Sequence, residues 1–500
     1  MTAQMRKGGT RPLVVAGVAV LVLSTAGLTA CGPRLPDADA AAELPGWAAD
    51  PPEVDALVEA ARAESELRTV LPAYSSGQRA MRATLDGLAT QAAADQQQAW
   101  YRSWLDELAA LDFDALSLEG KVDYIGLRNR IEFELAMVAD GREMVGGGQG
   151  PIGEEGLRAH LQREMIPYTA EELLAIAEAE FAWMDEALLE ASRAMGYGDD
   201  WQAAQEAVKQ AAVPPGEKPG LIRDLAYQSE AFVEDMDAIT LPPLMREIWR
   251  MGMRGPQGQQ TNPFFTGGTQ ITISYPTQDM THDFKLMSMR GNNPHFNRAT
   301  VHHELIPGHG LQGFMSQRFN PHRGLFSTPF WGEGWALYWE FLLWDEGFPR
   351  GPEDEVGMLF WRMHRAARIV FSMSYHLGRM TEQEAVDYLV DRVGFERSNA
   401  EAEVRRSVRA DPLYQAAYML GGLQFHALYR ELVESGRMSA RDFHDGILQG
   451  GRMPVELVRL RMTGEGLTRS YTTQWRFYGD PLANQVAVNG ERAATSRRSP

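Results

Sequence analysis

Apolar residues recur at helical spacing along most of this chain. In residues 53–140 they follow this period with few prolines between them, as at Val54, Leu57, Val58, Ala61 and Leu67. Two later stretches carry the signal of a capped helix start, because Thr169 precedes Glu172, and Thr381 precedes Glu384, by three residues. We therefore predict a mainly α fold.

Only one stretch alternates as a β-strand does. Residues 270–276 place Ile271, Ile273 and Tyr275 on one face, which predicts a small β-ribbon in an otherwise helical protein. Runs rich in glycine, proline or glutamine predict loops at 146–150, 214–219 and 251–268. The last of these is the best internal boundary, and we see no internal repeat.

The N-terminus has the pattern of a secretory signal. Three basic residues precede the apolar run Leu13–Leu23, which is too short to span a bilayer and suits a signal core. The run closes with Leu-Thr-Ala-Cys at 28–31, which looks like a bacterial lipobox and makes Cys31 the lipidation site. We predict a lipoprotein signal peptide over 1–30, a spacer over 31–51, one helical domain over 52–486 and a disordered tail over 487–500.

Composition narrows the classes of function. The 500 residues, 44% of them hydrophobic, can bury one very large core or two domains. Removing the signal takes away three basic residues and leaves 45 basic residues against 67 acidic ones, so the formal charge falls from −19 to −22. Such an acidic body is a poor binder of nucleic acid. Cys31 is the only cysteine, so no disulfide framework supports the fold.

The most informative stretch is Val-His-His-Glu-Leu-Ile-Pro-Gly-His-Gly-Leu-Gln at 301–312. His303 followed by Glu304 is typical of zinc peptidases, in which the glutamate is the general base. His309 comes six residues after His303, about 240° and roughly 9 Å away on a regular helix, which is wrong for shared ligation.

Pro307 and Gly308 remove this difficulty. Pro307 deletes the backbone bond to the carbonyl four residues earlier, and Gly308 admits dihedral angles that other residues avoid. Two residues can then loop out as a bulge and bring His309 back toward His303. The alternative pair, His302 and His309, is in phase but about 10 Å apart along the axis. We therefore predict His303 and His309 as ligands.

A carboxylate is the best candidate for a third ligand. Glu333 opens a nearly all-apolar helix and lies seven residues before Glu340, so the two share a helix face within about 20°. Two buried carboxylates are costly unless they meet a cation or hydrogen bonds. Glu333 as ligand and Glu340 behind a ligand histidine would satisfy both. Taken alone, each residue could instead be a helix cap or an ordinary polar group.

These motifs resemble those of the bacterial family labelled domain of unknown function 885, whose pattern is HExxPGHH-x-Q followed by EGWALYxE. The resemblance continues through 400–406, 412–421, 443–445 and 450–454 and covers most of the chain from about 50 to 475. That family is similar to helical zinc peptidases such as angiotensin-converting enzyme and thermostable carboxypeptidases. Their third ligand is a Glu a little over twenty residues after the second His, and Glu333 follows His309 by 24. Position 310 is Gly where the family usually has a second His.

The resemblance and the motif together imply a mechanism. Zinc held by His303, His309 and Glu333 would activate water and polarise a peptide carbonyl, with Glu304 as the base. Tyr418, in a family-like segment, is the candidate oxyanion donor, and Arg406 or Arg405 would bind a substrate carboxylate. Other candidate donors, which the sequence does not rank, are His376, His426 and His444.

The sequence leaves open several alternatives for the role of the strand and for the function of the protein. The strand at 270–276 could pair with the backbone of a peptide substrate, or it could be an ordinary β-ribbon. The protein could be a catalytically inactive, zinc-stabilised binding lipoprotein, although binding alone does not need Glu304. It could also be a zinc amidase that acts on a non-peptide amide, such as a cell-wall linkage.

Overall fold

The computed structural model of the protein describes residues 65–482, except 86–87, 89, 140–149, 262–263, 275 and 409–410. This part of the chain is mainly α-helical with one small sheet, which confirms the predicted fold class. The elements in chain order are η1 (Glu66–Arg68), α3 (Val70–Leu85), α4 (Gln91–Ala110), η2 (Phe113–Ala115), α5 (Leu118–Ala139), α6 (Gly153–Arg163), α7 (Ala170–Ala194), α8 (Trp201–Gln210), α9 (Lys218–Asp235), α10 (Pro243–Ile248), β1 (Arg250–Met253), α11 (Pro256–Thr261), β2 (Gln270–Ile273), α12 (His282–Arg290), α13 (Pro294–Glu304), α14 (His309–Ser316), η3 (Pro321–Phe326), α15 (Pro329–Asp345), α16 (Pro352–His376), α17 (Glu382–Val393), α18 (Arg397–Ser407), α19 (Tyr414–Tyr429), the π-helical turn η4 (Arg430–Glu434), α20 (Ala440–Gly450) and α21 (Val455–Thr463).

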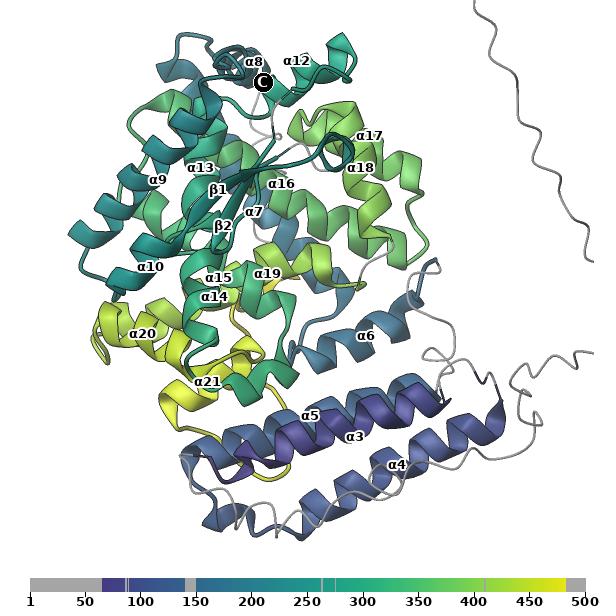
Figure 1. The fold of residues 1–500 in the computed structure, drawn as a ribbon. Helices are drawn as coiled ribbons and strands as arrows, with labels where there is room; N and C mark the ends of the chain where they lie inside the picture. The colour runs from purple at the N-terminus through teal and green to yellow at the C-terminus, as the bar shows by residue number, and fades with distance from the viewer. Residues whose placement is uncertain are drawn as a thin grey trace, which may run out of the picture.

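The first three helices, α3, α4 and α5, lie together at one end of the molecule, purple to blue in Figure 1. Aromatic side chains fill the space between α3 and α4. The Tyr74 ring lies 5.4 Å from the Trp100 ring and meets the Trp104 ring edge-on at 5.2 Å, and all three are buried. The apolar period of the sequence therefore predicted these helices correctly over the described part of 53–140.

Both predicted capping boxes are present. The Thr169 hydroxyl accepts the Glu172 N–H at the start of α7, and the Glu172 carboxylate accepts the Thr169 N–H in return. Thr381 and Glu384 do the same for α17. The loop predicted at 214–219 is shorter than expected, because α9 begins inside it; a proline in the first helical turn needs no N–H partner and does not delay the helix.

The prediction of a loop over residues 251–268 was wrong. Strand β1 pairs in parallel with β2, with Arg250 opposite Gln270, and helix α11 follows β1. Strand β1 has only four residues, Arg-Met-Gly-Met, which are too few to show a period in the sequence. In β2, Ile271 and Ile273 are buried as predicted, but the strand ends at Ile273, short of the predicted 276.

Three helices at the centre of the fold position the candidate site. Helices α15 and α19 touch backbone to backbone, because a Cβ at Gly334 would lie 2.6 Å from the Gly421 Cα. Helix α16 packs against α7, α13 and α19. The contact of α15 with α19 brings residues from 333 and from 414–418 to one place, although they are some eighty positions apart in the chain.

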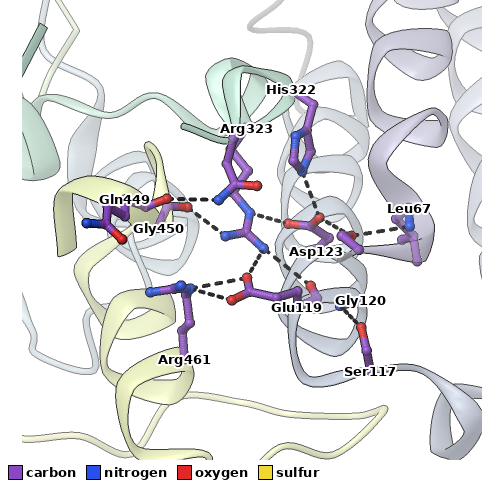
Figure 2. A network of polar contacts seen from close by, with 12 residues as sticks. Leu67, Ser117, Glu119, Gly120, Asp123, His322, Arg323, Gln449, Gly450 and Arg461 are labelled. Atoms are coloured by element: carbon purple, nitrogen blue, oxygen red, sulfur yellow. Dashed lines mark hydrogen bonds and ion pairs between the residues drawn. The ribbon is translucent and has the colours of Figure 1, made fainter. Parts of the chain in front are cut away.

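A buried ion network joins the N-terminal helices to the rest of the molecule (Figure 2). Arg323 of η3 and Asp123 of α5 are both fully buried, and the guanidinium Nε donates to the carboxylate at 2.6 Å. Arg323 also donates to Glu119 and to the Gly450 carbonyl, while Arg461 of α21 pairs with Glu119. The network thus ties α5, η3, α20 and α21 together.

Several sequence predictions fall outside the described residues: the signal peptide over 1–30, Cys31, the spacer over 31–51, most of the loop at 146–150 and the tail over 487–500. Within the described ranges, no helix is both long and apolar enough to cross a membrane.

Candidate metal centre

The helix that carries His303 breaks after Glu304, where α13 ends, and α14 begins at His309. Two backbone hydrogen bonds cross the break and reach back six residues instead of four: from the Gly308 N–H to the His302 carbonyl (2.9 Å) and from the Leu311 N–H to the Leu305 carbonyl (3.0 Å). The predicted insertion of two residues is therefore present. The predicted bulge within one helix is not, because the helix divides in two.

Pro307 and Gly308 fit this break as the sequence suggested. A Cβ at Gly308 would lie 1.8 Å from the His303 carbonyl oxygen, so no larger residue fits there. The Pro307 carbonyl, which has no place in a helical ladder, accepts a hydrogen bond from the Trp335 indole at 2.9 Å. The break is thus held in place by helix α15, the helix that carries Glu333.

The structure brings His303, His309 and Glu333 together. One donor atom from each lies within 4.8 Å of the others. The Glu333 Oε2 atom is 3.0 Å from His309 Nε2 and 3.6 Å from His303 Nε2. His302 is not among these donors, and it is buried edge-on to Phe348. These three side chains could hold one metal ion, and they are the three that the sequence predicted.

The donor set fits zinc. Zinc bonds of about 2.0–2.1 Å in a tetrahedron place neighbouring donors roughly 3.3–3.4 Å apart. The spacings from Glu333 Oε2 to the two imidazole nitrogens, 3.0 and 3.6 Å, lie on either side of that value, and all three donor atoms lie within 4.8 Å of one another. Two imidazole nitrogens and one carboxylate oxygen are the ligands of a catalytic rather than a structural zinc site, because a fourth position remains for water or substrate.

Glu340 supports His303 from behind. Its Oε1 atom lies 2.7 Å from His303 Nδ1, so the other ring nitrogen, Nε2, is the one directed at Glu333. Glu340 in turn lies 3.5 Å from the Arg365 guanidinium. A carboxylate behind a histidine ligand fixes its tautomer and ring orientation. The predicted role of Glu340 therefore agrees with its position.

The imidazoles and carboxylates of this cluster shift one another's pKa values. Burial would lower the pKa of His303, but the carboxylates of Glu333 and Glu340 outweigh it and raise the pKa to about 9. Burial would raise the pKa of Glu333, yet the two imidazoles hold it well below its usual range. The site therefore holds a charged carboxylate against imidazoles, and metal binding would displace their protons.

Glu304 lies beside these donors and is held by the loop that precedes the motif. The Gly267 N–H donates to Glu304 Oε2 at 2.6 Å, and the Gly268 N–H donates to the Glu304 carbonyl at 3.0 Å. A Cβ at Gly267 would lie 1.8 Å from that carbonyl oxygen, so the loop can approach only because residue 267 is glycine. This contact fixes the carboxylate, and no pattern in the sequence predicted it.

A cavity of about 420 Å³ opens at the site. Its wall includes His303, Glu304, His309, Glu333, Tyr414, Tyr418, three arginines (Arg365, Arg368 and Arg406) and the segment 264–267. The described residues of the predicted strand at 270–276 do not line it. Thr266 pairs with Thr272 through two hydrogen bonds, so segment 264–267 lies between β2 and the cavity. The strand is therefore part of a small ribbon, and any exposed edge belongs to 264–267.

Two tyrosines of α19 face the cavity. Tyr418, predicted from the sequence, stacks parallel to the His303 ring at 6.2 Å. Tyr414, which the sequence analysis missed, donates its hydroxyl to Glu333 Oε1 at 2.7 Å and lies 3.3 Å from the Tyr418 hydroxyl. Their spacing of four residues on one helix was the available signal.

The other candidates lie in different places. Arg406 lines the cavity and pairs with Glu403, whereas Arg405 is exposed and does not line it. The three histidines that the sequence offered as further candidate oxyanion donors are not part of the cavity wall: His376, His426 and His444. His444, for example, is buried between the Tyr338 hydroxyl and the Ala238 carbonyl, each 2.8 Å away. These histidines are therefore no oxyanion donors in this arrangement.

Position 310 could not carry a histidine in this structure. A Cβ at Gly310 would lie 2.6 Å from the Leu305 carbonyl oxygen and 2.8 Å from the Met245 methyl group. His309, one residue earlier, already points its Nε2 at Glu333. The departure from the family pattern at 310 thus leaves the set of three donors complete.

The fold and the site define a helical protein with two histidines and a glutamate converging in a cavity. Residues 141–462 match the model of a family described as "Bacterial protein of unknown function (DUF885)", and the chain belongs to that family. No curated protein matches the sequence.

Two bacterial proteins of solved structure, each described as a "putative lipoprotein", are similar in fold. The one from Shewanella oneidensis, of unknown function, is 19% identical with a TM-score of 0.55, over 80% of this chain and 78% of its own. The one from Colwellia psychrerythraea is 17% identical with a TM-score of 0.52, over 82% and 75%.

Proposed function

We propose that this protein is a zinc-dependent hydrolase that cleaves peptide bonds and is anchored to the bacterial cell envelope as a lipoprotein. One observation carries the proposal: His303, His309 and Glu333 converge in the wall of a cavity that Glu304 also lines. Metal binding alone would need only the first three. A fourth, non-ligating carboxylate held at the same cavity supports a hydrolytic role.

Zinc, Glu304 and segment 264–267 have different roles in the proposed reaction. Zinc, when bound, supplies a Lewis acid that acidifies water and polarises a carbonyl group. Glu304, fixed by the Gly267 N–H, takes the proton from the attacking water and passes it to the leaving amine. Segment 264–267 lies in the cavity wall and is bridged to β2 through Thr266, which supports it as the place where an extended peptide could pair.

The direct test is a chelator experiment on purified protein. We expect about one zinc per chain in elemental analysis, and cleavage of a mixed peptide library that stops with a chelator and returns when zinc is added. Cleavage that continues in fully demetallated protein would contradict the proposal. Zinc binding without cleavage of any peptide would favour the inactive binding protein, or an amidase if a cell-wall amide is then cleaved.

Replacing Tyr414 by Phe is expected to weaken zinc binding by about 10- to 100-fold, because partners of a ligating group typically contribute that much. The hydroxyl that donates to Glu333 Oε1 would be lost while the ring is kept. Competition against a chromophoric chelator measures the affinity. The exposed Tyr197, changed to Phe, is the matched control. Unchanged affinity in the Tyr414 variant would mean that this hydrogen bond does not hold the ligand.

We further expect Cys31 to be the lipid-modified N-terminus of the mature protein. The likeness in fold to two proteins described as "putative lipoprotein" agrees with the lipobox-like sequence. Several acyl chains anchor a protein stably, whereas one chain binds a membrane only marginally. Mass spectrometry of the protein from the membrane fraction checks this. A mature chain that begins at Met1, or carries an unmodified Cys31, would contradict it, and Cys31→Ser should release the protein from the membrane.

A further inference from the structure

Arg254 follows strand β1 directly and lies outside the cavity wall. Its backbone N–H donates to the Ile273 carbonyl at 2.8 Å, so it continues the pairing of β1 with β2 by one residue. Within the part of the chain that the structure describes, its guanidinium group binds two hydroxyl groups and no carboxylate. A partly buried charge without a contacting countercharge is costly, so the position of this arginine needs a reason other than an ion pair.

The guanidinium group holds segment 264–267 at two points. Its Nη2 atom donates to the Thr266 hydroxyl at 2.8 Å, and its Nε atom donates to the Ser274 hydroxyl at 3.2 Å. The Ser274 hydroxyl in turn donates to the Phe264 carbonyl at 3.2 Å. The planar fork of an arginine fixes two acceptors relative to each other. Arg254 therefore sets the position of this part of the cavity wall from behind.

The Arg254 side chain is itself fixed by helix α11. A Cβ at Gly258 would lie 2.9 Å from the Arg254 Cγ atom, so the helix packs closely against the stem of the side chain. The fully buried Gln259 donates its amide to the Arg254 carbonyl at 2.8 Å. Because its stem and its backbone are both held, this arginine can support a neighbouring segment with little loss of conformational entropy.

The supported segment reaches the general base one residue further on. The Thr266 backbone pairs with Thr272 of β2 through two hydrogen bonds, and the next N–H, that of Gly267, donates to Glu304 Oε2 at 2.6 Å. The charges agree with this arrangement. Burial lowers the pKa of the Arg254 guanidinium, and the attraction of the Glu304 carboxylate opposes that shift, so the two groups interact across the segment.

We propose that Arg254 is a positioning residue for the hydrolysis: through Thr266 it fixes the Gly267 N–H, which in turn fixes the Glu304 carboxylate. The inference rests on the proposed function and gives a role to a residue outside the cavity wall. A general base must lie within hydrogen-bond reach of the attacking water, and a misplacement of about 1 Å can cost about 100-fold in rate. The alternative is an arginine that only stabilises the ribbon.

The first variant removes the donors of the guanidinium and keeps an unbranched stem. Arg254→Met should lower kcat by about 10- to 100-fold, with a smaller change in KM and no loss of zinc. Arg254→Lys, which can still donate to one of the two hydroxyls, should recover part of kcat. Arg250→Met is the matched control, because Arg250 is exposed four residues earlier on the same strand, and it should behave as the wild type. An unchanged kcat in Arg254→Met, or a loss confined to KM, would overturn the inference.

A second variant breaks the same contact from the other side. Thr266→Val removes the hydroxyl that accepts from Arg254 and keeps the branched shape of the side chain. It should lower kcat in the same way, and it tests the contact even if Arg254→Met fails to fold. The double variant should be no slower than the slower single one, because both changes break one link. Losses that simply multiply would mean that the two residues act separately, which contradicts the proposal.

The Glu304→Gln background separates positioning of the base from support of the fold. When the base is absent, nothing remains for Arg254 to position. Arg254→Met combined with Glu304→Gln should therefore be no slower than Glu304→Gln alone. A further loss in that background as large as in the wild type would show that Arg254 acts on the fold and would overturn the inference.

Hydrogen exchange followed by mass spectrometry tests the contact without any catalysis. The Gly267 amide should exchange about 10- to 100-fold faster in Arg254→Met and in Thr266→Val, and as in the wild type in Arg250→Met. Faster exchange in a protein that cleaves no peptide would leave the hold on Glu304 standing and refute the hydrolase. Peptide cleavage with exchange and kcat both unchanged in Arg254→Met would refute this inference and leave the hydrolase standing.

Discussion

Changing Glu304 to Gln is expected to abolish nearly all hydrolysis, by about 10²–10⁴ in kcat, while the protein stays folded and keeps its zinc. Gln has the shape of Glu but cannot accept the proton of the attacking water. Its amide oxygen can still accept the Gly267 N–H, so the loop that holds residue 304 should stay in place. The three metal donors are untouched by the change.

Steady-state kinetics with metal analysis of the same samples checks this expectation. Glu346→Gln makes the same chemical change at an exposed position just beyond α15 and should leave kcat as in the wild type. Near-normal turnover in the Glu304 variant would point to another base. Loss of zinc together with activity would instead mean that Glu304 supports the metal site.

The sequence predicted which three side chains lie together at the candidate metal centre, because the geometry that decides their placement is local. Pro307 and Gly308 show where the helix must fail, and the failure brings His309 back to His303. The spacing of Glu333 and Glu340 on one apolar helix placed both on one face, and the structure puts one at the metal donors and the other behind His303. In each case the spacing of residues within about two helical turns decides where the side chains lie.

The rest of the site depends on contacts between distant elements. Arg365 and Arg368, three positions apart, look in the sequence like the solvated face of a long helix. They are buried because α19 packs against α16, and Arg368 also pairs with Glu403 of α18. Gly267 reaches Glu304 from a segment that resembled an ordinary loop, and the four residues of β1 are too few to show a period. No pattern of neighbouring residues could have placed these groups.

The Tyr418 hydroxyl is the group that we propose as the oxyanion donor, and both the sequence and the structure point to it. The Tyr418 ring is parallel to that of His303, and its hydroxyl is 3.3 Å from that of Tyr414, which holds Glu333. Burial, with the nearby Glu333 charge, raises the pKa of the Tyr418 phenol, so it stays protonated and can donate at neutral pH. A neutral donor next to the metal donors suits a developing oxyanion.

We therefore expect Tyr418→Phe to lower kcat by about 10²–10³, or roughly 3–4 kcal/mol, with little change in KM, thermal stability or zinc content. The ring and its packing against Arg368 are kept, so only the hydroxyl is tested.

The Tyr414→Phe variant is the control. That change should weaken metal affinity, so excess zinc should restore its activity. Excess zinc should not restore the activity of Tyr418→Phe. Normal turnover in the Tyr418 variant, or early melting, would make Tyr418 a packing residue. The oxyanion donor would then have to be sought among the other donors in the cavity wall, with Arg406 the first candidate, because the Tyr414 hydroxyl already donates its proton to Glu333.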